Sequence, residues 1–331
     1  MRSSMSDNAV DSELLAGDSG SVRLSSSTVG MLFGITSAAA YTAANVCLRN
    51  VALVCDPAWV ACVRAVPLAV VSVFLVTLQV HRGVRALPPL RLVPALLALA
   101  IFTQFGGNVA YQFSLGTVGV AVTSTLTYGT LILVGALLAW LILREPLSRA
   151  GWFGLSLTVM AIVLLGSAAN EAASSLGHGA TETDARLVVV GVLCSFSAGL
   201  AYAFCNIFVR RMVTNYTSLS GTLVFFAITG VVVLSVTSLA RLGYDALAQT
   251  TPEQYAWMIG GGVCNAIAFY SIAKCLQLVS VARVNALNAS QLAMVALVGT
   301  VLFDEAVTFG LVSGVALTIA GLLVMHRGSA V

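Results

Sequence analysis

Long apolar runs alternate along the chain with short polar segments. Each of ten such runs is close to the ~20 residues that a helix needs to cross a bilayer. Hydrocarbon offers no partner for backbone amides, and a helix is the structure that satisfies them within a single segment. The pattern predicts an all-α membrane protein with transmembrane helices at 29–50, 58–80, 91–113, 118–142, 149–168, 187–210, 217–240, 254–276, 280–302 and 308–326.

The segments outside these spans are polar. Residues 1–28 are rich in Ser and Asp and lack the apolar core of a signal peptide, so they are predicted to form a disordered cytoplasmic tail. The longest connection, 169–186, is acidic and is predicted to be an extracytoplasmic linker. It separates a first unit of five helices at 29–168 from a second at 187–326, and 327–331 form a short cytoplasmic tail.

Three polar residues recur in the two halves at the same spacing. Tyr41, Asn45 and Arg49 lie four residues apart, and the series returns as Tyr202, Asn206 and Arg210. Steps of four residues place the side chains of each series near one helix face. A short acidic motif also follows the fourth span of each half, as Arg144-Glu145-Pro146-Leu147 and as Asp304-Glu305-Ala306-Val307. These matches indicate that the second half is a copy of the first.

The distribution of charge predicts the orientation of the chain. A cytoplasmic N-terminus places most Lys and Arg residues inside and most Asp and Glu residues outside, as the positive-inside rule requires. The C-terminus is then cytoplasmic too. Each half has five spans, an odd number, so the second half is inserted upside down relative to the first, with Glu145 facing in and Glu305 facing out. Two inverted repeats of this kind are the architecture of transporters that work by alternating access.

Composition narrows the class of protein further. The chain is 59% hydrophobic and 9% charged, whereas a soluble domain is about half apolar and about a quarter charged. The net charge of +3 is small and no basic tract is present, so nucleic acid is not an expected partner. The seven cysteines form no C-x-x-C pair. Inside apolar runs they are expected to act as small hydrophobic residues, with a disulfide or a metal site as the alternative.

The chain resembles the EamA-type members of the drug/metabolite transporter superfamily over residues 29–326. The resemblance rests on the ten spans in two inverted halves, on the acidic motif after each fourth span, and on Arg64 following Trp59 in the second span. Within the superfamily the chain is similar to the aromatic amino acid exporters of the YddG type. The resemblance implies a bacterial inner-membrane exporter of small metabolites, whose central cavity is lined by the first, third, fourth, sixth, eighth and ninth helices.

Uncharged polar side chains inside the spans are the candidate substrate-binding residues, because polar groups at bilayer depth tend to face the bundle interior. The alternative is that each one only bonds a neighbouring helix, which contributes ~0.6 kcal/mol on average. Glycines precede two of the candidates, at Gly106-Gly107 and Gly260-Gly261-Gly262, and fit either close helix packing or a backbone that faces a cavity. The candidates are Tyr41, Asn45, Gln104, Asn108, Tyr111, Thr127, Tyr128, Tyr202, Asn206, Asn265, Tyr270, Asn285, Asn288 and Gln291.

Charged residues are rare within the spans. Arg64 fits a snorkelling or helix-pairing arginine as well as a gate or substrate contact, and Lys274 fits snorkelling. The carboxylates fall in loops or at span ends, where Glu145 and Glu305 are expected to cap helices or form salt bridges between helices. Ion-driven carriers commonly place a carboxylate near the middle of the membrane. The chain is therefore expected to work by facilitated diffusion.

A neutral and mostly apolar cavity suits an uncharged or zwitterionic solute with an apolar side chain. The sequence favours export of aromatic and other apolar amino acids. Another small metabolite or drug is the alternative substrate, and a membrane-embedded enzyme or a scaffold is the alternative from another class. No H-E-x-x-H, G-x-S-x-G or Walker A motif is present, so no catalytic residue, metal or cofactor is expected. The expected partners are the lipid bilayer and a small-molecule substrate. The sequence is compatible with a monomer.

Overall fold

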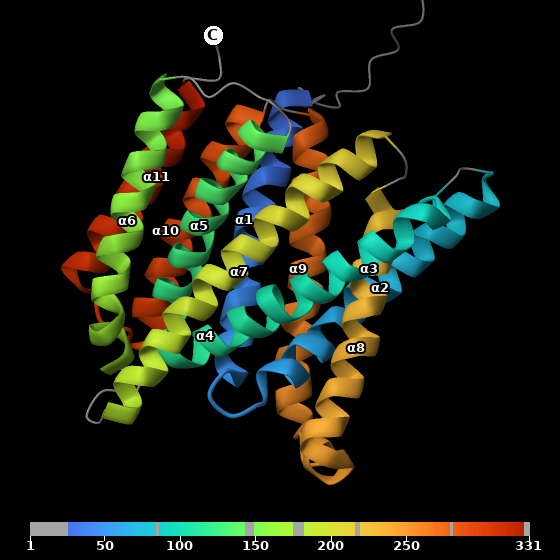
Figure 1. Cartoon of the computed structure of the whole chain (residues 1–331), viewed down its shortest axis with the longest axis horizontal. Coiled ribbons are helices and arrows are strands. Elements are labelled where there is room, and N and C mark those ends of the chain that lie inside the picture. Colours follow the sequence, from blue (N-terminus) through green and yellow to red (C-terminus); the bar gives the residue numbers. More distant parts are fainter. Residues whose placement is uncertain are drawn as a thin grey trace, which may run out of the picture.

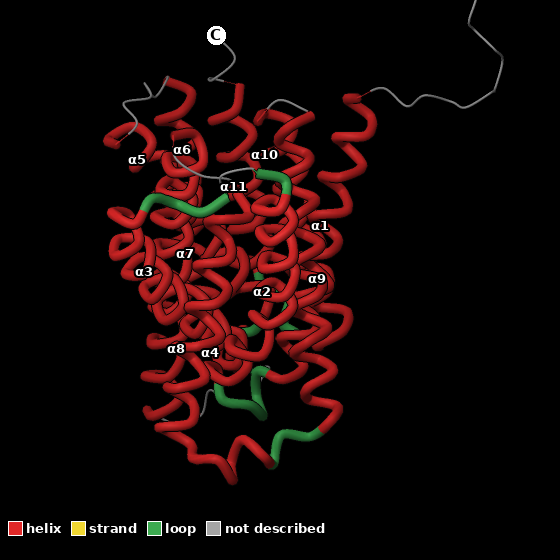
Figure 2. Tube along the Cα trace, turned by 90° about the vertical axis from the view of Figure 1, so that its right-hand side faces the viewer, coloured by secondary structure: helices red, strands yellow, loops and turns green. Residues whose placement is uncertain are grey.

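Helices account for all regular structure in the part of the chain that the structure describes (Figure 2). They lie alongside one another as a bundle (Figure 1). Six of them are long and apolar enough to cross a membrane, and three shorter ones are also apolar. The computed structural model describes residues 26–83, 86–142, 149–174, 182–215, 219–278 and 281–327.

The first half of the chain forms five rods. Its elements are α1 (Ser26–Val51), α2 (Pro57–His81), η1 (Leu90–Leu92), α3 (Val93–Phe102), η2 (Thr103–Val109), α4 (Ala110–Val118), α5 (Val120–Ile142) and α6 (Arg149–Ser174). The elements from η1 to α4 follow one another without a break and make one rod. Within that rod η2 is a π-helix, a widened turn that is rare and often found at functional sites.

The second half also forms five rods. They are α7 (Glu182–Asn215), α8 (Leu219–Ala248), α9 (Pro252–Leu278), α10 (Val281–Phe303) and α11 (Phe309–Arg327). Near its end α8 is interrupted at Gly243, whose φ of 77° lies outside the helical region. Each predicted span thus corresponds to one helical rod of the described chain.

The ends of several elements differ from the prediction. The third rod continues to Val118 and α5 starts at Val120, so the two are separated only by Gly119, whose φ of 82° reverses the chain. Parts of the predicted linker 169–186 are helical, because α6 reaches Ser174 and α7 begins at Glu182. α1 begins at Ser26, inside the predicted tail. The rest of both tails and of the linker lies outside the described residues.

The two halves run in opposite directions through the bundle. α1 begins and α11 finishes at the same end, which we call the terminal end, whereas α7 begins at the opposite end (Figure 1). α5 ends and α6 begins at the terminal end, whereas α10 ends and α11 begins at the opposite end. The first acidic motif, 144–147, falls outside the described residues, and the second lies between α10 and α11.

The closest helix pairs join one half to the other. α1 packs along α9, α6 along α11, α2 along α8 and α5 along α7. Glycine allows several of these contacts, since a Cβ on Gly314 would meet Leu165 and one on Gly261 would meet Leu48. The two repeats are therefore interleaved and share one interior.

The outer surface of the bundle is that of a membrane protein. Large apolar side chains are exposed along the helices, including Val70 at 63% and Phe74 at 62%, which a soluble protein would not tolerate as a continuous surface. The rings of Trp140 and Trp152 meet at the terminal end, with centroids 5.9 Å apart. Trp59 and Tyr255 meet at the opposite end. Aromatic residues at both ends are typical of membrane interfaces.

Candidate functional site

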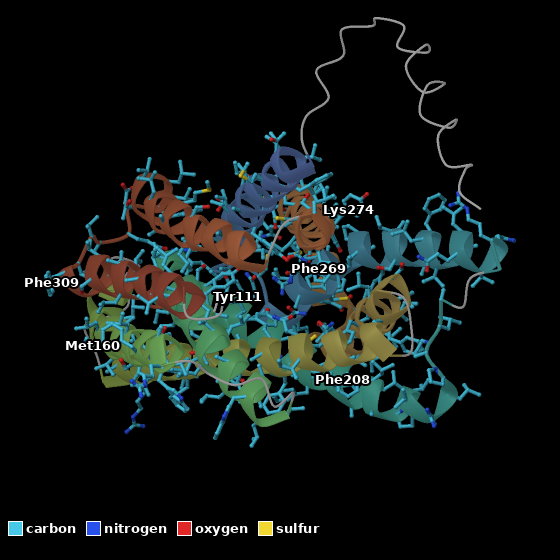
Figure 3. All side chains as sticks on the ribbon, turned by 90° about the horizontal axis from the view of Figure 1, so that it is seen from above. Tyr111, Met160, Phe208, Phe269, Lys274 and Phe309 are labelled. Carbon is cyan, nitrogen blue, oxygen red and sulfur yellow. The ribbon has the colours of Figure 1, made fainter. Side chains whose placement is uncertain are left out.

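Polar side chains from both repeats gather in the interior of the bundle, where Tyr111 lies near the middle when the bundle is seen from above (Figure 3). By contrast, Met160 and Phe309 lie at the rim, and both are exposed. The side chains that we call the central polar cluster are linked by hydrogen bonds or by electrostatic contact. They are Tyr41, Asn45, Arg64, Gln104, Asn108, Tyr111, Ser124, Tyr128, Tyr202 and Gln291.

The first part of the cluster links three helices of the first repeat. The hydroxyl of Tyr111 on α4 donates to Asn45 Oδ1 on α1, at 2.9 Å. The same hydroxyl lies 2.8 Å from Ser124 Oγ on α5. All three side chains are buried, with Asn45 7% exposed. A buried tyrosine hydroxyl needs a partner of this kind, because an unpaired one would be costly in an apolar surrounding.

The second part of the cluster is built around the π-helix. Arg64 on α2 donates to Asn108 Oδ1, and the hydroxyl of Tyr202 on α7 donates to the same oxygen at 2.8 Å. Asn108 Nδ2 in turn donates to Gln104 Oε1 at 2.7 Å, and Gln104 Nε2 donates to the carbonyl of Phe226 on α8. This chain of bonds crosses from the first repeat to the second.

Glycines in η2 bring α7 close to this chain of bonds. A Cβ on Gly107 would lie 2.9 Å from the Tyr202 ring, and one on Gly106 would lie 3.3 Å from Ser197 Oγ. Ser197 Oγ donates to the carbonyl of Gly106 at 3.0 Å. Of the two roles that the sequence left open for this glycine pair, the contacts favour close packing between helices.

The third part of the cluster joins the fourth rods of the two repeats. Gln291 Nε2 on α10 donates to the hydroxyl of Tyr128 on α5, at 2.5 Å. Tyr128 also lies near enough to Tyr41 and Tyr202 for electrostatic interaction. Nearby, Thr127 Oγ1 donates to the carbonyl of Ser195 on α7, at 3.2 Å. The tyrosines thus come from α1, α4, α5 and α7 and converge on one region.

Several predicted residues are not brought into the cluster. Tyr270 is 53% exposed, and its ring lies 5.9 Å from Lys274 Nζ. Asn206 is exposed on α7, and Asn265 is half-buried on α9. Asn285 and Asn288 belong to α10, and their side chains lie outside the described residues.

Two members of the cluster, Arg64 and Ser124, are not among the candidate substrate-binding residues predicted from the sequence, although a substrate contact was one of the roles left open for Arg64. Serine is common in apolar helices, so Ser124 carries only a weak signal in the sequence. Arg64 did give a signal, since it is a charged residue inside a span, but its direction could not be read from the sequence. In the structure it points into the cluster and is 8% exposed.

A second polar site, which we call the Glu305 clamp, lies at the opposite end. The carboxylate of Glu305 accepts hydrogen bonds from the backbone of Val120 at 2.6 Å and of Ala121 at 2.9 Å. These amides form the start of α5, where a helix favours negative charge. Arg49 Nε lies 3.4 Å from Glu305 Oε1, with side-chain exposures of 5% and 1%. The expected capping and salt-bridging roles of Glu305 are both confirmed by these contacts.

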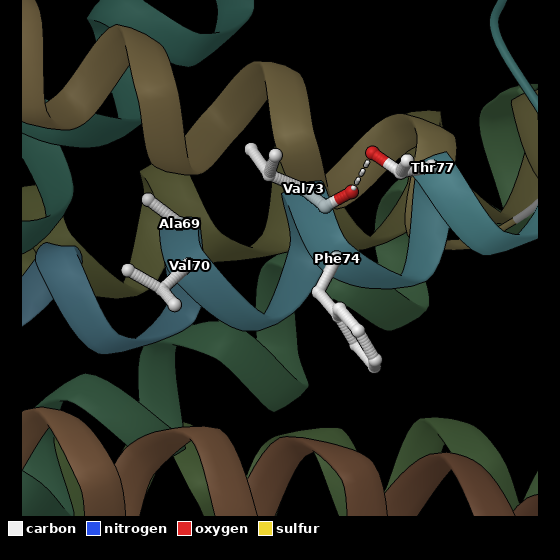
Figure 4. Close-up of a pocket in the computed structure, with 5 residues that line it drawn as sticks. All are labelled: Ala69, Val70, Val73, Phe74 and Thr77. Atoms are coloured by element: carbon white, nitrogen blue, oxygen red, sulfur yellow. Dashed lines mark hydrogen bonds between the residues drawn. The ribbon is translucent and has the colours of Figure 1, made fainter.

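No metal-binding group marks another site in the described residues. They contain no group of three or more His, Cys, Asp or Glu that could hold a metal, and the seven cysteines are free thiols. Two shallow surface hollows are lined mainly by apolar side chains. One lies along α2 at Ala69, Val70, Val73, Phe74 and Thr77 (Figure 4), and the other at Ala185, Arg186, Val189 and Val190. Such grooves suit lipid chains, and neither contains a predicted site residue.

Fold and site together define an integral membrane protein made of two interleaved helical repeats around a polar interior of mostly uncharged side chains, into which Arg64 points. The model of the EamA-like transporter family matches the chain twice, at 28–167 and at 189–327. The chain therefore belongs to the EamA-like transporter family, and it is a membrane transporter of small substrates.

Comparison with solved structures supports the same fold. A structure titled only "Crystal structure of protein" matches with a TM-score of 0.59 and 15% sequence identity, over 89% of this chain and 95% of that one. At this identity the likeness concerns the fold alone. A comparison with curated proteins finds no match.

Proposed function

We propose that this protein exports aromatic and other apolar amino acids across the bacterial inner membrane, by facilitated diffusion and alternating access. The observation that carries the proposal is the central polar cluster, because both repeats contribute to it in the interior of the bundle. Tyr202 and Gln291 of the second repeat bond Asn108 and Tyr128 of the first. Transporters built from inverted repeats place their substrate site at such an interface.

The proposed topology has ten transmembrane helices with both termini in the cytoplasm. The described rods support it, because α1 begins and α11 ends at the terminal end. Arg82, Arg91 and Arg149 also lie at that end, next to the ends of α2, η1 and α6. At the opposite end Arg49 and Arg241 are paired with Glu305 and Asp56. The arginines gathered at the terminal end thus support that end as the cytoplasmic one.

Alternating access is supported by a difference between equivalent residues of the two repeats. Asn45 and Asn206 hold the same place in the repeated motif, yet Asn45 is buried and bonded to Tyr111 whereas Asn206 is exposed. At the opposite end the Glu305 clamp ties α10 and α11 to α1 and α5. We infer a conformation closed at the opposite end, from which the repeats exchange environments during transport.

The chemistry of the cluster supports the proposed substrates. Tyrosine rings offer flat apolar surfaces for an aromatic or aliphatic side chain, while their hydroxyls and the amides of Asn45, Asn108 and Gln291 can donate and accept hydrogen bonds. Among described side chains the only buried carboxylate is Glu305, and the clamp already engages it. A carboxylate that takes up and releases a proton or a sodium ion at the cluster is absent from the described residues, which supports facilitated diffusion.

Flux in proteoliposomes tests the proposal. Vesicles containing the purified protein and unlabelled Phe or Trp should take up the labelled amino acid by exchange, and vesicles without protein should not. Flux of a nucleotide sugar or a cationic dye without flux of any amino acid would reject the substrate and keep the transporter. A scaffold would give no flux of any solute.

A further inference from the structure

Arg64 is a buried positive charge in the middle of the polar interior. It lies about 10 Å along α2 from Pro57, at 1.5 Å per residue, and it is 8% exposed. The ion pairs among described residues are Arg49 with Glu305 and Arg241 with Asp56, so none of them neutralises Arg64. Removing an arginine from water without a counter-charge costs several kcal/mol. A site that retains an uncompensated positive charge therefore favours the binding of an anionic ligand.

The neighbours of Arg64 hold its guanidinium in place without neutralising it. Its partners among the described residues are the oxygen of Asn108 and the hydroxyl of Tyr202. Asn108 is itself fixed by Gln104, which is bonded to the α8 backbone. A guanidinium has five N–H donors, and two acceptors engage it here, Asn108 Oδ1 and the Tyr202 hydroxyl. This leaves donors with which the planar fork can bind a carboxylate through two parallel bonds.

The surroundings limit the charge and shape of the anion. One arginine among neutral groups balances a single negative charge, whereas a phosphate dianion would leave charge uncompensated. Tyr111 and Tyr202 lie near Arg64, and Tyr128 lies near both of them. Their rings provide an apolar surface next to the charge. A cation with no carboxylate would instead be repelled by the buried guanidinium.

We propose that Arg64 binds the carboxylate of the transported solute, and that the protein accepts small monocarboxylates with an apolar side chain while rejecting amines and amides of the same shape. This inference rests on the proposed function and narrows its substrate class. It assigns the selective contact to the carboxylate of an amino acid, and it requires no contact to the amino group.

Four ligands with the same ring test this selectivity in the full-length protein. Phenylalanine and 3-phenylpropionate carry the carboxylate, whereas phenylalaninamide and phenethylamine do not. Two readouts are measured for each ligand: competition with labelled Phe exchange in proteoliposomes, and the rise in the thermal unfolding temperature in detergent. In the wild-type protein we expect both carboxylates to compete and to stabilise, and the amide and the amine to bind at least about 10-fold more weakly, as the loss of a charged hydrogen bond implies.

Variants assign the selectivity to the arginine. Arg64→Gln should raise the KM for Phe by about 10- to 100-fold and abolish the preference for carboxylates, while Arg64→Lys should keep the preference in weakened form. Arg241→Gln is the matched control, because Arg241 is 59% exposed at the opposite end and lies outside the cluster. It should leave KM and ligand preference unchanged. If Arg64→Gln does not fold, the wild-type ligand series and Arg64→Lys still decide the question.

The outcomes separate this inference from the proposed function. Equal binding of phenylalaninamide and Phe by the wild type, or an unchanged preference in a folded Arg64→Gln variant, would overturn the role of Arg64 even if Phe is transported. Absence of Phe exchange, together with Arg64-dependent stabilisation by 3-phenylpropionate, would reject amino acid export and support the carboxylate site. Absence of stabilisation by either carboxylate would also overturn the role of Arg64.

Discussion

The carboxylate of Glu305 caps a helix that begins 185 positions earlier in the chain, at the backbone amide of Val120. The two residues belong to different repeats, so this contact joins the halves at the opposite end of the bundle. Arg49 completes the contact from α1 and also lies over the ring of Phe303, 5.4 Å from its centre. The start of α5 is therefore set by the second repeat.

Replacing the charge of the clamp should destabilise the folded protein. Glu305→Gln removes the negative charge that α5 and Arg49 both engage, leaving a buried arginine without its partner, at a cost of about 3–5 kcal/mol. Thermal unfolding in detergent should show a lower midpoint. Asp304→Asn is the matched control, because Asp304 is exposed with a φ of 51°, a conformation that asparagine tolerates well. An equal loss in both variants would contradict the clamp.

Gly119 should be intolerant of a side chain for two separable reasons. Its φ of 82° disfavours any residue with a Cβ, and that Cβ would lie 2.6 Å from Glu305 Oε1. Gly83 has a φ of 72° but nothing within 4 Å of its Cβ position. Gly83→Ala should therefore cost only the backbone term of about 1–2 kcal/mol, and Gly119→Ala should lower the unfolding midpoint further. Similar unfolding midpoints in the two variants would indicate that the new Cβ displaces Glu305 without a cost in folding free energy.

A methyl group at Gly107 should disturb the central polar cluster. The added carbon would lie 2.9 Å from the Tyr202 ring, and overpacking of this kind costs about 1–3 kcal/mol. We expect Gly107→Ala to lower the initial rate of Phe exchange more than the yield of folded protein. Gly135→Ala is the control, since nothing lies within 4 Å of its Cβ position in α5. An unchanged initial rate of Phe exchange in Gly107→Ala would indicate that transport does not depend on the contact between Gly107 and Tyr202.

The two asparagines of the repeated motif should respond differently to truncation. Asn45→Ala removes one partner of the Tyr111 hydroxyl, which keeps Ser124, so a loss of about 0.5–1.5 kcal/mol is expected. Asn206 is exposed, and Asn206→Ala should change stability by no more than about 0.5 kcal/mol. The double variant should transport poorly with its folded yield largely intact, as measured by size-exclusion chromatography. Loss of folded protein would indicate a purely structural role.

Transport should not depend on ion gradients. The charged side chain that we place next to the substrate is an arginine, and the described residues place no carboxylate beside it that could carry a proton or a sodium ion. Exchange rates should therefore be the same before and after collapse of the proton and sodium gradients, at pH 6 and at pH 8. Accumulation of Phe against its own gradient would contradict facilitated diffusion.

The helices could be predicted from the sequence because their signal is local. Runs of apolar residues place the rods to within a few residues at most ends, and the odd number of spans in each half predicts the inversion of the second half. The π-helix at Thr103–Val109 could not be read, since its apolar pattern is that of an ordinary helix. The predicted spans place the turn between the third and fourth helices at 114–117, whereas it lies at Gly119, because apolar residues continue through it on both sides.

The site was harder to predict because its contacts join distant parts of the chain. Polarity within a span identified Tyr111 and Gln291, but the partner of each depends on helix packing. Tyr270 has the same polarity, yet it is exposed beside Lys274. The repeated Tyr-x-x-x-Asn-x-x-x-Arg series suggests two equivalent asparagines, whereas their surroundings differ in the structure. One sequence is compatible with both conformations of an inverted repeat, and it does not indicate which of the two the protein adopts.

The position of Glu305 has a consequence for how this chain came to be a single protein. The first five rods contain neither the acid that completes the start of α5 nor the acid that neutralises Arg49, since both functions are supplied by one residue of the other half. Sequence symmetry suggests two autonomous modules. Physically, the first module is an incomplete folding unit, and its fusion to the second copy guarantees that the complement is always present in equal number.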